Sequence, residues 1–199
     1  MDKELIDWAK SVLLSHPLMP KLLNAITKEN EKMQSLGYAS RHYEVGQSTY
    51  DFLENMLALN IRKKDIYYLY INVREILRDM DEDERYILEE RFFSRKGMDE
   101  IMPKVNIRTC YRRYNTALEH FASALLYYGY SIDLLDEKFG GDIVIGRIHR
   151  AVMDKKILFK RESKPHKKRT HTVYIESSEV APRVPISLTP LLSIFSLFC

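Results

Sequence analysis

The amino-acid sequence predicts an all-α fold, a helical bundle followed by a basic C-terminal tail. Apolar residues recur at spacings of three and four along most of the chain, and the two-residue alternation that is typical of strands is nearly absent. The chain has seven glycines and seven prolines among 199 residues, which leaves long stretches free of helix breakers. With 45% hydrophobic and 30% charged residues, it can bury a core and keep a polar surface.

Two helices are predicted at the N-terminal end, over about residues 3–15 and 18–35. They are separated at "SHPLMP", where Pro17 and Pro20 interrupt the helical pattern. After Gly37 the segment "YASRHYEVGQ" has the composition of a loop.

Two further helices are predicted between this loop and Met80. Ser48 or Thr49 can cap the first, which runs to about Leu59, because a side-chain oxygen there satisfies free amide groups of the first turn. Asn60 can cap the second in the same way. The apolar positions of the second helix recur at steps of four and three: Ile66, Tyr70, Val73, Leu77 and Met80. Its tyrosines could stack on nucleic-acid bases, but such a stripe is more often buried against another helix.

The segment "DEDERYILEERFF" predicts a helix that begins after Asp81. Asp81 and Glu84 have the spacing of a capping box, and several carboxylates gather at the positive end of the helix dipole. "SRKG" should end this helix, with Gly97 in the left-handed conformation. A short helix is then expected over "MDEIM", and Pro103 should stop it because proline disfavours helical geometry in the preceding residue.

The segment "VNIRTCYRRYNTALEHF" predicts a helix from Ile107 to about Tyr127, capped by Asn106. At about 100° per residue, its side chains separate into two faces. The apolar face contains Ile107, Cys110, Tyr111, Tyr114, Ala117, Leu118, Phe121 and Leu125. The polar face contains Arg108, Thr109, Arg112, Arg113, Asn115 and Thr116. We expect the first face to pack into the protein and the second to stay exposed.

Charge is distributed unevenly around this helix. From Asp81 to Glu100 there are eight acidic and four basic residues, whereas from Ile101 to Leu118 there are four basic residues and no acidic one. The formal charge of the whole chain is only +3, so an inference about partners must rest on where the basic residues are concentrated. A helix face of arginine, asparagine and threonine suits phosphates and base edges. A plain solvated face, or one that binds a protein partner, is the alternative.

These segments resemble a known family of DNA-binding domains. The run "DEDERYILEERFF", "MDEIM" and "VNIRTCYRRYNTAL" is similar to the fourth conserved region of bacterial sigma factors, and more closely to phage transcriptional regulators of the ArpU and RinA type. Glu100 and Ile101 match the start of the second helix of their helix-turn-helix. The residues that match the opening of their recognition helix are Arg108, Thr109, Tyr111, Arg112 and Arg113. The resemblance covers about residues 77–125 and includes no promoter-melting region upstream.

The resemblance implies a recognition helix in the major groove of double-stranded DNA, with its N-terminal residues on base edges. The residues expected to contact bases are Arg108, Thr109, Arg112, Asn115 and Thr116. The residues expected to contact phosphates, which position a protein without reading sequence, are Arg95, Lys96, Lys104 and Arg113. The resemblance also allows contact with RNA polymerase, without locating it.

The C-terminal part is predicted to contain one more helix and a long tail. Asp142 should cap a helix that runs to about Lys156. The segment "KRESKPHKKRTH", with six basic residues and one acidic residue, should be a flexible arm that either adds salt-sensitive attraction to DNA or is a solvated linker. The remainder, ending in "LLSIFSLFC", is either a disordered tail or a docking peptide. The chain thus divides into four regions, 1–80, 81–128, 129–159 and 160–199.

Several classes of protein are disfavoured by the sequence. Cys110 and Cys199 form no disulfide framework, and this fits a reducing interior such as the cytoplasm. The start "MDKELIDWAK" lacks the basic lead and apolar core of a signal peptide. The apolar run "LLSIFSLFC" is about half the length of a membrane helix, so no membrane partner is expected.

Catalytic chemistry is also not expected. The six histidines are scattered without the spacing of a zinc site. The segment "FGGDIVIG" lacks the lysine and the serine or threonine of a phosphate-binding loop. We therefore expect neither an enzyme, nor a bound metal, nor a cofactor.

The basic helix face and the resemblance together favour a sequence-specific DNA-binding transcriptional regulator, and the resemblance implies a phage or prophage origin. Two alternatives remain open. Small terminase subunits use a helix-turn-helix to mark phage DNA for packaging and assemble as rings, and a helical module could instead bind an acidic protein. The N-terminal helices are expected to brace the DNA-binding motif or to mediate self-association, so a homo-oligomer is also open.

Overall fold

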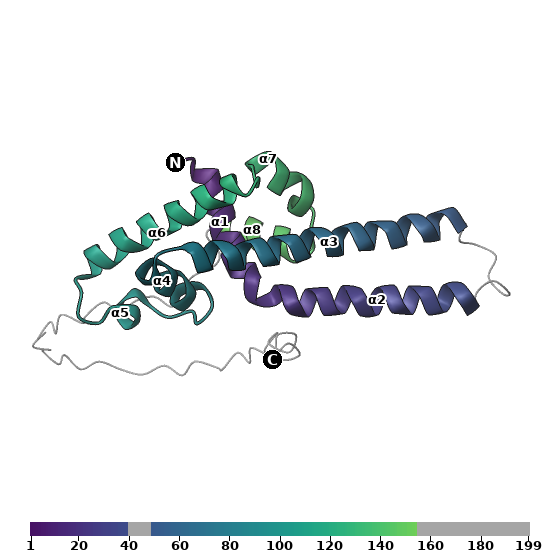
Figure 1. Cartoon of the computed structure of the whole chain (residues 1–199), viewed down its shortest axis with the longest axis horizontal. Helices are drawn as coiled ribbons and strands as arrows, with labels where there is room; N and C mark the ends of the chain where they lie inside the picture. Colours follow the sequence, from purple (N-terminus) through teal and green to yellow (C-terminus); the bar gives the residue numbers. More distant parts are fainter. Residues whose placement is uncertain (40–48, 155–199) are drawn as a thin grey trace, which may run out of the picture. The chain divides into compact units, whose positions relative to one another are not determined.

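The computed structural model of the chain describes residues 1–39 and 49–154, and every regular element in this part is helical (Figure 1). The prediction of an all-α fold is therefore confirmed for these residues. The predicted basic arm and tail, residues 160–199, lie outside them, as does most of the predicted loop after Gly37. None of the described helices has both the length and the apolar composition needed to cross a membrane.

The helices follow one another with short connections. Their bounds are α1 (Lys3–Ser15), α2 (Met19–Ala39), α3 (Thr49–Asp79), α4 (Glu82–Phe92), α5 (Met98–Ile101), α6 (Ile107–Tyr127), α7 (Ile132–Leu135) and α8 (Ile145–Met153). A 3-10 turn, η1 (His16–Leu18), joins α1 to α2, and a π-helical turn, η3 (Asp136–Gly140), follows α7. The predicted break between the first two helices is thus confirmed, with Pro17 inside the 3-10 turn. The second helix continues past its predicted end, through Gly37 to Ala39.

The prediction of two helices between residues 48 and 80 is wrong, because α3 is continuous through Asn60. The Asn60 side chain does not cap a helix. Its Oδ1 accepts a hydrogen bond from Nδ2 of Asn30 on α2, at 3.1 Å, so it ties two helices together. An asparagine inside a helix costs only a few tenths of a kcal/mol relative to better helix formers, roughly 0.7 at most, and the pairing of α2 with α3 outweighs this cost.

The predicted apolar stripe of α3 is confirmed as a packing surface. Ile66, Val73 and Leu77 are buried, and Tyr70 and Met80 are partly buried against the core. The stripe spacing of three and four thus identified the side of the helix that faces the protein.

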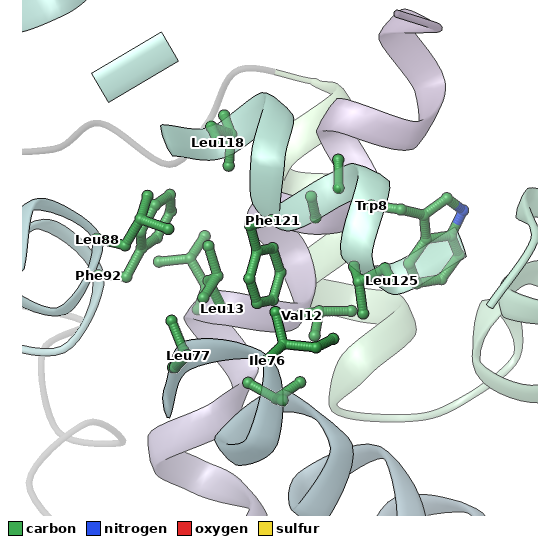
Figure 2. Packing of buried hydrophobic residues seen from close by; sticks show 14 of the residues in the cluster. Trp8, Val12, Leu13, Ile76, Leu77, Leu88, Phe92, Leu118, Phe121 and Leu125 are labelled. Atoms are coloured by element: carbon green, nitrogen blue, oxygen red, sulfur yellow. The ribbon is translucent and has the colours of Figure 1, made fainter. Parts of the chain in front are cut away.

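One hydrophobic core unites helices from distant parts of the sequence. Figure 2 shows side chains from α1, α3, α4 and α6 meeting in it, namely Trp8, Val12, Leu13, Ile76, Leu77, Leu88, Phe92, Leu118, Phe121 and Leu125. Phe121 is completely buried at this junction. Residues from the predicted regions 1–80, 81–128 and 129–159 therefore share a core, and most of the apolar side of α6 is anchored in it.

Helix α8 is fixed against α1 by an aromatic and polar cluster. The rings of Trp8 and His149 stack with their centroids 3.7 Å apart and their planes within 7°. Nδ1 of His149 lies 3.1 Å from Oγ of Ser11, and Nε1 of Trp8 donates to Oδ1 of Asp136 at 3.1 Å. These contacts close the chain back onto its first helix.

Asp142 was predicted to cap the helix that becomes α8; the N-cap residue is Val144, and Asp142, just before it, binds the backbone there. Its Oδ1 accepts hydrogen bonds from the amides of Val144 and Ile145, at 2.8 and 2.9 Å. Its Oδ2 forms an ion pair with Nε of Arg62 on α3, at 2.8 Å. The helix ends at Met153, and the predicted end at Lys156 lies outside the described residues.

His16 is held neutral at the corner between α1 and α2. Its ring stacks on Tyr70 and on Phe93, with centroids 4.9 and 5.2 Å away, and its Nε2 is buried without a hydrogen-bond partner among the described residues. Burial lowers the pKa of His16 to about 4, the charge of Arg74 acts in the same direction, and a hydrogen bond with the Tyr70 backbone offsets part of the shift. Further charged side chains around the same cavity are Arg78, Arg85 and Glu89.

Acidification is expected to destabilise the fold through His16. An unfolded histidine binds a proton near pH 6.5, whereas the folded chain binds it only near pH 4, so the unfolded state binds more protons between these values. The free energy of unfolding should fall as the pH drops below about 6.5 and level off near 4. The His16→Phe variant keeps a ring between Tyr70 and Phe93 and should lose this component. Denaturant unfolding of the parent and the variant at pH 7 and pH 5 measures this pH-dependent stability. If both proteins lost the same free energy of unfolding between pH 7 and pH 5, the effect could not be assigned to His16.

Candidate nucleic-acid interface

The helices α4, α5 and α6 position the candidate interface. Helix α4 begins after Asp81, as predicted, but the predicted capping box does not form. The Asp81 side chain makes no capping hydrogen bond, and Glu84 instead binds Nδ1 of His120 on α6, with 2.8 Å between Nδ1 and Oε1. The Glu84 carboxylate thus joins α4 to α6, because a partner from another helix replaces the local one.

The end of α4 differs from the prediction at one residue. Arg95, with a φ of 56°, adopts the left-handed conformation that was expected for Gly97. Gly97 has a φ of −70° and precedes α5, where its carbonyl oxygen accepts hydrogen bonds from Glu100 and Ile101. The left-handed residue comes earlier than predicted because α4 already ends at Phe92. The chain turns toward α5 three residues later, at Arg95.

The connection from α5 to α6 is short and partly buried. Helix α5 has only four residues, and its Met98 and Ile101 side chains enter the core. The chain then passes Pro103, as predicted, to Asn106, whose Oδ1 accepts a hydrogen bond from the Arg108 amide at 2.9 Å. The predicted cap of α6 is therefore confirmed, and so are both of its bounds.

The predicted apolar face of α6 is buried except at two positions. Its Cys110, Tyr114, Ala117, Leu118, Phe121 and Leu125 side chains are in the core. Ile107 and Tyr111 were expected on this side but are 42% and 40% exposed. Ile107 is the first residue of the helix and Tyr111 lies at the edge of the apolar arc, so neither is enclosed.

The predicted polar face of α6 is open to solvent in the part of the chain that the structure describes. Arg108, Arg112, Arg113, Asn115 and Thr116 are exposed, and Thr109 is partly exposed. None of the three arginines forms an ion pair with another described residue. The Thr116 hydroxyl donates to the Arg112 carbonyl oxygen at 3.1 Å, which leaves its lone pairs as acceptors.

We refer to Arg108, Thr109, Arg112, Arg113, Asn115 and Thr116 as the arginine face. Tyr111 and Glu119 border the same surface. Glu119 is the first acidic side chain after Glu100, so more than two turns at the start of α6 carry positive charge alone. The sequence did not indicate that Tyr111 would be accessible beside the arginines, because the helical wheel placed it on the apolar face.

The residues predicted for phosphate contacts have different surroundings. Arg95 and Lys104 are exposed, in the turns before α5 and α6. Lys96 is paired with Glu90, and the hydrogen bond to this carboxylate raises the pKa of its ammonium group. The carbonyl oxygen of Lys96 also accepts from Nη1 of the buried Arg91, at 2.8 Å, which fixes the backbone here.

No known protein family, curated protein or solved structure matches this chain. Among the described residues, no group of three or more histidine, cysteine, aspartate or glutamate side chains is placed to hold a metal ion. Any functional interpretation therefore depends on the arginine face and on the surfaces that the helices present.

Proposed function

We propose that this chain is a sequence-specific DNA-binding protein that regulates transcription, with α6 as its recognition helix. The observation that carries this proposal is the separation of α6 into a buried apolar face and an exposed arginine face. A recognition helix needs both properties, because it must be held rigidly by the protein while its other side enters the major groove.

The arginine face offers the chemistry that distinguishes base pairs. Arg108 and Arg112 lie one turn apart, and each guanidinium can donate two hydrogen bonds to O6 and N7 of guanine. Asn115 can pair with adenine in the same bidentate manner, and Thr109 and Thr116 can touch base edges or thymine methyl groups. These five residues are the proposed base readers.

Positive groups beside them are suited to the DNA backbone. Arg113 is at the edge of the face, and Arg95 and Lys104 project from the turns that precede it in the chain. Lys96 would either leave Glu90 to bind a phosphate or contact Glu90 and the phosphate together. Such contacts set the register of the protein on the duplex and make its affinity fall with rising salt.

The resemblance to the sigma-type helix-turn-helix supports the same assignment. Glu100 and Ile101 on α5, followed by the arginine and threonine pair that opens α6, are arranged in the order of that motif. In this proposal α5 and α6 form the motif, the setting is a phage or prophage, and RNA polymerase is a candidate partner.

Sequencing of the DNA fragments that the protein retains from a genomic pool tests this function. The proposal predicts that one motif is enriched. Titration of that motif, and of random duplex, at 50 and at 200 mM salt should show steep weakening of both, by about 10³-fold if some six phosphates are contacted. Retention without any enriched motif would reduce the protein to a nonspecific DNA binder, and no retention at all would favour a protein-binding module.

A further inference from the structure

A second surface of the molecule is apolar and exposed. It is a stripe on α3 whose members are Tyr50, Leu53, Leu57, Ile61 and Tyr68, between 51% and 74% exposed. At about 100° per residue they fall within an arc of roughly 80°. Soluble proteins scatter such residues singly, so five of them within one arc along about five turns of a helix, interrupted by Lys64, indicate a contact surface. We call it the α3 stripe.

Within the part of the chain that the structure describes, the α3 stripe is not needed for the packing of α3. Another side of the same helix supplies Ile66, Leu69 and Val73 to the core, each at most 1% exposed. The hydrogen bond between Asn30 and Asn60 ties α3 to α2. The stripe is therefore an additional apolar side on a helix that is already anchored.

We propose that the α3 stripe binds the α3 stripe of a second copy of the chain, with the two helices antiparallel. In that arrangement four of the five members of the stripe face one another. If the twofold axis passes at the level of position 59, Leu57 faces Ile61 of the second copy and Tyr50 faces its Tyr68. A contact of this kind uses the same patch on both subunits and closes as a dimer.

Charge along the helix agrees with this register. Glu54 lies at one flank of the stripe, five residues before the axis, and Lys64 lies within its arc, five residues after it. Both are exposed, and Lys64 extends over the Tyr68 ring at 5.9 Å. The antiparallel register sets Glu54 of each copy at the level of Lys64 of the other, so opposite charges lie across the interface. A parallel arrangement would instead set like charges side by side.

A groove beside Tyr68 gives the second copy a place to insert. It lies between α3 and the chain from Glu137 to Ile143, has a volume of about 890 Å³, and includes the buried ring of Phe139. Ile143 at its rim is 64% exposed. Tyr50, 74% exposed, comes beside this groove in the proposed dimer and can enter it from the other copy.

Dimerisation would place two arginine faces on one particle, which suits a DNA site with two half-sites. This consequence rests on the proposed function, whereas the dimer itself does not. The test therefore uses the full chain without DNA, and its failure would leave the DNA-binding proposal untouched.

Light scattering on the eluting full-length protein, over a range of concentrations, measures the assembly. We expect a mass approaching twice the chain mass of 23.5 kDa. The Leu57→Glu variant, which places two carboxylates in the apolar contact, should elute as a monomer with an unchanged helical circular dichroism spectrum. The control Leu126→Glu alters a leucine that is 46% exposed on α6 and should remain dimeric. A monomeric parent protein, as expected if the chain's own "LLSIFSLFC" end covered the stripe, would overturn the proposal. So would a ring of eight or more, which a packaging protein would form.

Charge exchange tests the register. Glu54→Lys and Lys64→Glu should each raise the dissociation constant of the dimer by about 2- to 30-fold, because each change affects two symmetric exposed pairs. The double variant restores opposite charges across the interface and should return the constant to near that of the parent. Additive weakening in the double variant would overturn the antiparallel arrangement.

Discussion

Replacing both Arg108 and Arg112 with alanine is expected to remove most of the preference of the protein for its own DNA site. Each arginine that pairs with a base contributes about 1 to 3 kcal/mol of discrimination, and the two contributions add as long as each arginine reads its own base pair. The double variant should therefore lose about 2 to 6 kcal/mol on the specific duplex and much less on a scrambled one. Fluorescence anisotropy with both duplexes at one salt concentration measures this difference.

The matched control for this experiment removes two positive charges elsewhere. Lys28 and Lys32 are exposed on α2, and their replacement by alanine should leave the specificity ratio unchanged. Both arginines are exposed, so the double variant should keep its fold. If Arg108→Ala/Arg112→Ala weakened the two duplexes by the same factor, the arginines would be assigned to phosphates rather than bases.

The second large effect is expected in the core. Phe121→Ala should destabilise the protein by about 3 to 5 kcal/mol, because the ring is fully buried where α1, α3, α4 and α6 meet and its loss leaves a cavity. A loss of this size is a large fraction of the roughly 5 to 15 kcal/mol that stabilises a typical domain. Urea unfolding followed by circular dichroism gives the value.

Tyr127 on the same helix provides the comparison. Its side chain is 90% exposed, so Tyr127→Ala should change the free energy of unfolding by no more than about 0.5 kcal/mol. If the two variants unfolded at the same urea concentration, α6 would not be anchored in the core through Phe121. The proposal that α6 is a rigidly held recognition helix would then lose its structural support.

The features of α6 that could be predicted are those encoded locally. Asn106 caps the helix through a bond that spans two residues, and the alternation of apolar and polar positions fixes which side is buried. These signals do not depend on the rest of the fold. The arginine face was accordingly predicted residue by residue, while the exposure of Ile107 and Tyr111 was not, because it depends on which helices reach them.

The features that could not be predicted are bonds between distant segments. Asn60 was predicted to cap a helix, but its side chain accepts a hydrogen bond from Asn30 of a neighbouring helix. Glu84 was predicted to belong to a capping box, but its carboxylate pairs with His120. The stacking of Trp8 on His149 joins residues 141 positions apart, and neither has a local pattern that indicates the other. Single polar side chains thus mislead a sequence interpretation wherever tertiary structure offers them a better partner.

Photochemical cross-linking measures most directly whether the arginine face meets DNA. A benzophenone amino acid in place of Thr116 lies on the exposed side of α6, and the same group in place of Lys28 lies on α2 as a reference. Irradiation with the selected duplex should attach DNA to the protein labelled at position 116 and leave the one labelled at position 28 unmodified. Cross-linking from position 28 alone, or from neither position under conditions where the duplex is bound, would contradict a recognition role for α6.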